Sequence, residues 1–246
     1  MEITPEFEAA HYDAQGHLAR MGNYYKWILD NFDGAIGRRV WDAGAGIGNV
    51  TELLTRQADF VLATELTERN LATLRTRFAG REDVVVAFCD LAHDDALDLA
   101  RHDLDTIITL DVLEHIEADL PALHRYRQIL RPGGRLLIKV PAHMALYGTV
   151  DEQSLHYRRY SKGELREKLQ IAGFEVERLK YMNMAATLPY FLKSRVFKQQ
   201  SSFSNSLDAD RIGLYDKLIP WLARAERILP VPFGLSVIAV ARAPGF

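Results

Sequence analysis

Apolar and polar positions along this chain follow two alternating patterns. Short apolar runs of strand length recur, and between them apolar residues return every three or four positions, the spacing of a helix that buries one face. Strands are predicted at 40–42, 60–64, 84–88, 105–110, 136–140, 174–181 and 235–241. Strands that alternate with helices favour an α/β fold, in which helices cover both faces of a mostly parallel sheet.

Two stretches outside this alternation are predicted to be helical. Before the first strand, a single amphipathic helix is indicated by apolar residues at helical spacing: Leu18, Met21, Tyr25, Ile28, Leu29 and Phe32. Between the last two strands, residues 182–232 mix apolar and basic positions and predict a helical cap. We expect a single domain over 1–246, with a helical segment (1–36), a binding core (37–181), the cap (182–232) and the last strand (233–246).

Composition narrows the class of protein. The 30 basic and 33 acidic residues nearly balance, so no electrostatic field of one sign covers the protein, which argues against a dedicated nucleic-acid binder. A single cysteine, Cys89, allows no intrachain disulfide and suits a reducing compartment. The first residues lack the basic and apolar regions of a signal peptide, and no apolar run reaches the roughly 18 residues of a membrane span. We therefore expect a cytoplasmic protein.

A glycine-rich turn carries the clearest chemical signal. Asp42 ends the first predicted strand, Gly44, Gly46 and Gly48 follow at alternate positions, and a helix-like segment begins at Asn49. Glycines let backbone N–H groups approach a ligand closely, and the helix N-terminus favours negative charge. A dinucleotide fold would show G-x-G-x-x-G instead. The preceding acid suits a nucleotide-like cofactor that carries an ammonium group and no phosphate.

The turn resembles motif I of class I S-adenosylmethionine (SAM)-dependent methyltransferases. Three further segments are similar to a bacterial group of small-molecule methyltransferases in this class: Leu-Asp-Val-Leu-Glu-His-Ile (110–116), Arg-Pro-Gly-Gly-Arg-Leu-Leu (131–137) and His-Tyr-Arg-Arg-Tyr (156–160). The resemblance covers nearly the whole chain. It implies a Rossmann-like seven-stranded sheet with one antiparallel strand. Asp42 replaces the usual Glu, Asp111 replaces a common Asn, and residues 182–200 keep little of the pattern.

The resemblance implies SAM as the cofactor and assigns contacts at the strand ends. Glu65 would accept both ribose hydroxyls, and Asp90 would accept the adenine amino group, with Leu91 against the ring. Asp42 and the glycine turn would hold the ammonium end. The remaining cofactor contacts are expected from Leu66, Leu110, Asp111 and Tyr24.

Methyl transfer to oxygen needs a base, and histidine is the natural one. His143 follows the fifth predicted strand and His156 opens the 156–160 segment, so these two are the preferred candidates, ahead of His115. Tyr147 and Tyr157 would orient an acceptor hydroxyl. Each of these side chains has a structural alternative, as a hydrogen-bonded or packed residue. We expect a small-molecule acceptor methylated at oxygen, with carbon and nitrogen as open alternatives.

Three other questions stay open at this stage. Arg158 and Arg159 would either bind an anionic acceptor or pair with nearby acids such as Asp151. Asp111, Glu114 and His115 are similar to the acidic cluster of metal-dependent O-methyltransferases of ubiquinone synthesis, but we expect no metal.

The cap would cover the acceptor, form a homodimer interface or, as the least favoured option, touch a membrane surface. A SAM-binding protein without methyl transfer is the main functional alternative. A nucleic-acid methyltransferase is a remote one, because 110–113 lacks the base-stacking motif of such enzymes.

Overall fold

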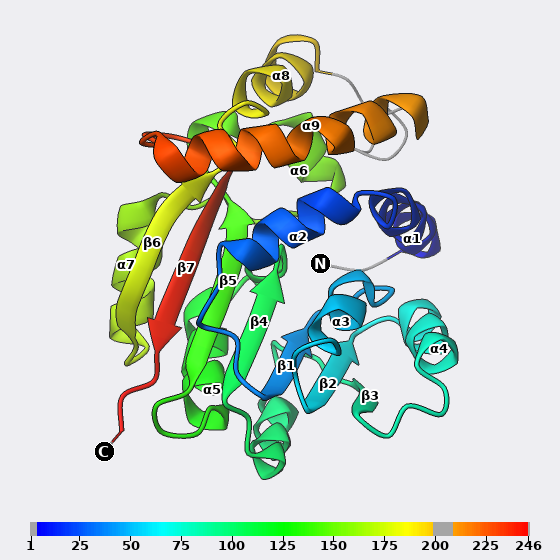
Figure 1. Ribbon diagram of the computed structural model, residues 1–246, viewed down its shortest axis with the longest axis vertical. Coiled ribbons are helices and arrows are strands. Elements are labelled where there is room, and N and C mark those ends of the chain that lie inside the picture. Colours follow the sequence, from blue (N-terminus) through cyan, green and yellow to red (C-terminus); the bar gives the residue numbers. More distant parts are fainter. Residues whose placement is uncertain (1–3, 199–208, 246) are drawn as a thin grey trace.

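All seven strands form one sheet in the computed structural model, which describes residues 4–198 and 209–245 (Figure 1). The strand order is β3-β2-β1-β4-β5-β7-β6, and β7 alone runs antiparallel to its neighbours. The strands are β1 (Arg39–Ala43), β2 (Phe60–Glu65), β3 (Val84–Phe88), β4 (Thr106–Leu110), β5 (Arg135–Pro141), β6 (Glu175–Met182) and β7 (Ser236–Arg242). The expected α/β class and the seven-stranded sheet with one antiparallel strand are confirmed.

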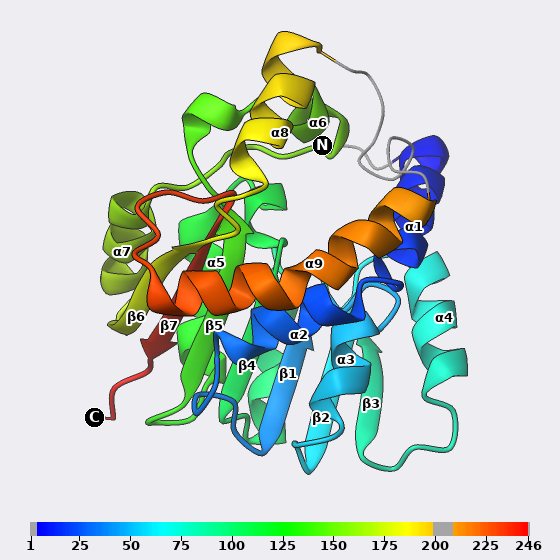
Figure 2. The same cartoon turned by 45° about the horizontal axis from the view of Figure 1, so that its top comes forward.

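Helices cover both faces of this sheet (Figures 1 and 2). The α-helices are α1 (Pro5–Leu18), α2 (Gly22–Asp30), α3 (Asn49–Leu54), α4 (Glu68–Arg77), α5 (Asp119–Ile129), α6 (Thr149–Gln153), α7 (Lys162–Ile171), α8 (Thr187–Phe191) and α9 (Ala209–Ile228). Helical segments of 3-10 or π type are η1 (Asp94–His102), η2 (Leu113–His115), η3 (Met144–Leu146) and η4 (Leu192–Val196). Among the described residues, no helix combines the length and the apolar character that a membrane crossing requires.

Alternate residues of the strands pack into two separate hydrophobic cores, one on each face of the sheet. In β1, Val40 packs with Trp27 and Phe32 on the face covered by α2 and α9. Trp41 points to the opposite face, where it packs with Tyr126 of α5, and its indole nitrogen donates to Thr64 Oγ1 at 2.8 Å. Both faces of the central strands are therefore buried, as the continuous apolar runs of a parallel sheet require.

The N-terminal segment contains two helices where the sequence pattern indicates one. The chain breaks after Leu18, and α2 starts at Gly22. Asp216 of α9 holds this start, because its carboxylate accepts the backbone N–H groups of Asn23 (3.2 Å) and Tyr24 (3.0 Å). Local periodicity cannot detect a helix cap that comes from a residue so distant in sequence. The expectation of one continuous helix through Leu18 and Met21 was therefore wrong.

The insertion between β6 and β7 is helical, as expected, but it divides into two parts. Helix α8 and turn η4 lie against the segment after β5, where Thr149 Oγ1 donates to the Ser194 carbonyl at 3.2 Å. Helix α9 lies beside α2 instead (Figure 2). Residues 199–208 of the expected cap lie outside the described residues.

Candidate active site

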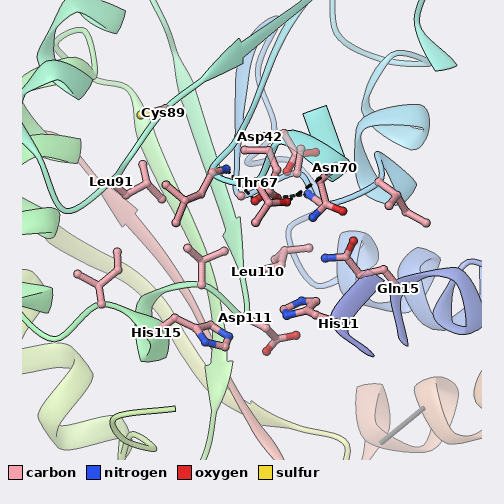
Figure 3. A pocket seen from close by; sticks show the side chains of 18 of the residues that line it. His11, Gln15, Asp42, Thr67, Asn70, Cys89, Leu91, Leu110, Asp111 and His115 are labelled. Atoms are coloured by element: carbon pink, nitrogen blue, oxygen red, sulfur yellow. Dashed lines mark hydrogen bonds between the residues drawn. The ribbon is translucent and has the colours of Figure 1, made fainter. Parts of the chain in front are cut away.

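A cavity of about 760 Å³ opens at the carboxyl ends of the parallel strands (Figure 3). Its floor is made by the segments that follow β1, β2, β3 and β4, and its walls come from α1 and α2. This is the edge where open α/β sheets bind ligands. None of the described residues of the 182–232 insertion lines it. Helix α1 lines the cavity where the cap was expected, and the described part of the cap does not.

The glycine turn needs glycine for its own geometry as well as for a ligand. Gly44, Gly46 and Gly48 have φ values of +79°, +57° and +87°, a backbone region that residues with a side chain rarely adopt. A Cβ at Gly44 would lie 2.5 Å from Val112. At Gly46 it would meet only the end of the Gln15 side chain, at 2.9 Å. Gly46 therefore lies at the cavity wall, where its nearest neighbour is the flexible end of the Gln15 side chain.

Asp42 lies at the bottom of the cavity and is almost fully buried. Its Oδ2 accepts a hydrogen bond of 2.6 Å from Thr51 Oγ1. Burial raises the pKa of Asp42 to about 7, against the opposing effect of the Thr51 hydrogen bond, and the charge of Glu65 adds to the rise. A carboxyl that titrates near neutral pH beside the glycine turn can respond directly to a cationic ligand.

The acids that follow β2 and β3 also line the cavity. Glu65 Oε2 accepts the Gly46 N–H at 2.7 Å, and Oε1 accepts the Leu66 N–H at 2.8 Å. Asp90 Oδ1 accepts the Ala92 N–H at 2.9 Å. Backbone donors hold these carboxylates in place, and each oxygen can accept a further hydrogen bond. Leu66 and Leu91 add apolar wall.

Tyr24, Leu110 and Asp111 line the cavity at the end of β4. Asp111 pairs with Lys139, a lysine that is only 3% exposed in the middle of the sheet. Burial alone would lower the pKa of Lys139, but Asp111 and Tyr24 together raise it, so the ammonium stays charged. Sequence analysis missed Lys139, although one lysine inside an otherwise apolar strand was the available signal.

Of the four residues preferred from sequence as catalytic, only one lines the cavity. Tyr157 lines it, whereas His143, Tyr147 and His156 are absent from its walls. The His143 ring lies against Tyr181, with 4.6 Å between ring centroids. The Tyr147 hydroxyl donates to the His156 carbonyl at 2.7 Å. Neither His143 nor Tyr147 therefore faces the cavity in which a cofactor and an acceptor would bind.

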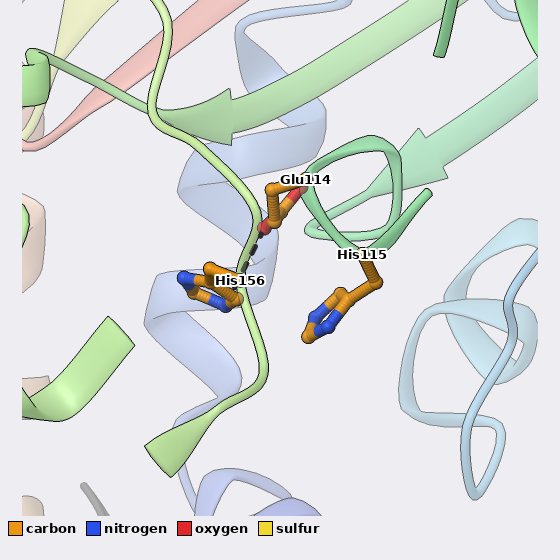
Figure 4. A group of neighbouring side chains, drawn as sticks. All are labelled: Glu114, His115 and His156. Carbon is orange, nitrogen blue, oxygen red and sulfur yellow. Dashed lines mark ion pairs between the residues drawn. The ribbon is translucent and has the colours of Figure 1, made fainter. Parts of the chain in front are cut away.

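His156 belongs to a buried polar network behind the cavity. Its Nδ1 lies 2.8 Å from Asp151 Oδ1, and its Nε2 lies 4.0 Å from Glu114 Oε1 (Figure 4). Asp151 also accepts from Arg159 Nε (2.8 Å) and the Tyr190 hydroxyl (2.8 Å).

The neighbouring Arg158 pairs with Asp119 at 2.9 Å. The two arginines therefore pair with acids of the chain, which is the alternative left open above for this segment.

Three histidines that were not among the preferred candidates line the cavity: His93, His115 and His11, of which the last two are buried enough for their pKa to shift. Burial lowers the pKa of His115 to about 3, and the neighbouring His156 and His11 add to the effect. Burial also lowers the pKa of His11, against the opposing charge of Glu65. Both imidazoles are neutral at ordinary pH, and burial makes each of them a weaker base than an exposed histidine. In sequence, Phe7, His11, Gln15 and Leu18 share one face of a helix, which was the signal for His11.

Glu114 has no exposed surface, and neither carboxyl oxygen has a hydrogen-bond partner among the described residues. Burial raises the pKa of Glu114 well above its ordinary value, and the charge of Asp111 adds to the rise. Glu114, His115 and His156 also form a group able to hold a metal ion, with ligand atoms within 4.8 Å of one another (Figure 4). Asp111, from the cluster suggested by sequence, is instead paired with Lys139.

Replacing Glu114 by glutamine should stabilise the protein more at pH 8 than at pH 5. The folded state keeps the carboxyl protonated while the unfolded chain releases the proton above about pH 4.5, so stability falls as pH rises through that window. Each pH unit costs up to about 1.4 kcal/mol until the folded pKa is reached. Thermal unfolding of the variant and the wild type at both pH values measures the difference. The exposed Glu152→Gln is the matched control and should show no such gain.

The chain is similar in sequence to known methyltransferases. A family model described as a methyltransferase domain matches residues 41–136. A probable SAM-dependent methyltransferase of Mycolicibacterium smegmatis is 29% identical over 145 residues, which are 57% of this chain and 53% of that protein. A ubiquinone biosynthesis O-methyltransferase of Aeromonas salmonicida is 25% identical over 112 residues, 46% and 47% of the two chains. The chain thus matches about half the length of these relatives.

A structural likeness extends over the whole chain. The complex between the Haloferax volcanii Trm112 methyltransferase activator and a putative methyltransferase contains a chain that matches with a TM-score of 0.66. The match covers 99% of this chain and 100% of that one at 18% identity, so it bears on the fold alone. The sheet order agrees with this likeness in fold, and within that fold residues 41–136 match the model of a methyltransferase domain.

Proposed function

We propose that the chain transfers the methyl group of SAM to a hydroxyl oxygen of a small-molecule acceptor, with His115 receiving the hydroxyl proton. The observation that carries the proposal is that a neutral imidazole lines the same cavity as Asp42, Glu65 and Asp90. His115 thus takes the role that sequence alone gave to His143 or His156. Several curated relatives are named as ubiquinone biosynthesis O-methyltransferases, which supports oxygen as the atom methylated.

For this reaction the protein must align the acceptor with SAM and accept the proton of the acceptor hydroxyl. SAM carries a methyl group on a sulfonium and supplies a good leaving group, so holding acceptor, methyl and sulfur in line can supply several kcal/mol. A neutral His115 can accept the proton as the oxygen attacks. Glu114, which is protonated in the folded protein, lies within 4.8 Å of a His115 ring nitrogen and is a neutral neighbour of the imidazole. Tyr157 also lines the cavity and would orient the acceptor.

Conversion of SAM to S-adenosylhomocysteine by the purified chain, with a panel of phenols, alcohols and amines, tests the proposal. We expect turnover with hydroxyl acceptors, and we expect it to persist after dialysis against a chelator, because the proposed mechanism uses no metal. Loss of turnover on dialysis, with recovery on adding a divalent ion, would assign Glu114, His115 and His156 to a metal instead. SAM binding without turnover on any acceptor would favour the non-transferring alternative.

A further inference from the structure

Helix α9 exposes a long apolar stripe. Leu214, Leu218, Trp221 and Ile228 are 63%, 50%, 74% and 73% exposed. Their spacings of four, three and seven residues place them on one face of the helix. The opposite face is occupied, because Ile219 is fully buried against α2 (Figure 1). Single exposed apolar residues are ordinary, but an aligned stripe of this size is typical of an interaction surface.

The charges beside this stripe are of one sign. Lys217, Arg224 and Arg227 of α9 are exposed. The two acids among the described side chains of α9 turn inward, where Asp216 caps α2 and Glu226 accepts the Asn183 and Met184 N–H groups. The described surface of α9 is therefore apolar and basic, although the whole chain has a net charge of −3.

We propose that the α9 stripe (Leu214, Leu218, Trp221 and Ile228) with its basic flank docks this protein on an anionic lipid surface. A helix of this kind lies in the membrane interface, with its apolar face among the acyl chains and its cations near lipid phosphates. Tryptophan is suited to that boundary, because its ring is apolar and its N–H is polar. Sequence alone placed membrane contact last among the three options for this segment. The exposure of the stripe and the absence of an exposed acid beside it, within the described part of α9, now favour it.

The docked face is coupled to the cavity through the fold. Asp216 of α9 holds the backbone of Asn23 and Tyr24, and Tyr24 lines the cavity. Docking of α9 would therefore fix α2, and with it one cavity wall, relative to the membrane. This inference does not depend on the proposed O-methylation, because it rests on residues outside the cavity.

Tryptophan fluorescence tests the inference, because the three tryptophans have very different surroundings. Trp27 and Trp41 are 5% and 0% exposed, so a change in emission on binding reports on Trp221. With vesicles of phosphatidylcholine and phosphatidylglycerol, we expect a blue shift, quenching by brominated acyl chains and weakening at high salt. Vesicles of phosphatidylcholine alone should give a much smaller effect. Trp221→Phe should abolish the fluorescence change while vesicle sedimentation still detects the bound protein.

Variants separate docking on lipid from other uses of the stripe. Leu218→Ser should weaken vesicle binding roughly tenfold, since interfacial binding scales with buried apolar area. The double change Lys217→Glu with Arg224→Glu should remove the preference for anionic lipid. Ile171→Ser on α7 is the control, because Ile171 is 55% exposed but lies outside α9.

Two outcomes would overturn the inference. The first is unchanged emission and no sedimentation of the folded, SAM-binding protein with anionic vesicles. The second is a lipid-free dimer, seen by light scattering, that Leu218→Ser converts to monomer, because the stripe would then bind a second copy of this chain.

Discussion

Asp42→Asn should lower the affinity for SAM by about tenfold or more and should remove most of its dependence on pH. The carboxylate is 3% exposed, at the bottom of the cavity and beside the glycine turn. In such a site a charge-assisted contact to the ammonium of SAM is worth about 1.5–3 kcal/mol, which corresponds to roughly ten- to a hundredfold in affinity. Asparagine has nearly the same shape but no charge, so the variant tests the charge itself.

The direction of the pH effect follows from the pKa of about 7 for Asp42 in the ligand-free protein. A cation binds the ionised carboxylate, so below pH 7 binding must first remove a proton. The affinity should therefore fall by up to about tenfold for each pH unit below 7, and it should level off above pH 8. Titration calorimetry at pH 6, 7 and 8 measures this slope in both proteins.

A control at the other end of the cofactor separates charge from general damage. Asp90→Asn changes the carboxylate that we expect to bind the adenine and leaves Asp42 intact, so it should weaken binding while the slope with pH remains. An equal slope in the Asp42→Asn protein would show that a different group titrates, and the assignment of Asp42 to the ammonium would fail.

The position of three acids at the cavity could be predicted from sequence because they follow strand ends. Asp42, Glu65 and Asp90 each come directly after an apolar run, and the carboxyl ends of parallel strands meet at one edge. A periodic pattern finds those runs, so it also finds the residues that follow them. All three acids line the cavity. The antiparallel last strand came from the family resemblance, because periodicity carries no information about strand direction.

The same argument failed for His143, although it also follows a strand. The backbone at His143 has a φ of +62°, which turns the chain, and the ring packs on Tyr181 of β6, the strand on the far side of β7. A local turn of this kind decides toward which face of the sheet a side chain points. The residue types around Pro141 do not predict such a turn. A strand end therefore predicts a position along the sheet edge but does not predict the direction of the side chain.

Glu114 and His115 show the same limit at shorter range. They are adjacent in a three-residue turn, yet Glu114 has no exposed surface and His115 lines the cavity. Sequence places both residues after β4 and cannot separate their roles. The break between α1 and α2, which depends on Asp216, was hidden for a different reason, since the two partners are 192 residues apart.

His115→Gln should lower kcat with a hydroxyl acceptor by about 10²-fold, the lower end of the usual contribution of a positioned base because its low pKa makes His115 a weak base, with little change in SAM affinity. Glutamine retains a hydrogen-bonding side chain but cannot accept the proton. The matched change His143→Gln should leave kcat nearly unaltered, because His143 does not line the cavity.

The pH profile adds a second, independent readout for His115. A histidine base is active when neutral, and a pKa of about 3 keeps His115 neutral throughout the range above pH 4. At saturating SAM and acceptor, kcat should therefore stay flat through pH 6.5, where an ordinary histidine would lose activity as it takes up a proton. An acid limb near pH 6.5 that survives in His115→Gln would point to another histidine. An unchanged kcat in that variant would remove His115 from the mechanism, because a base that receives the acceptor proton cannot be dispensable to the step it assists.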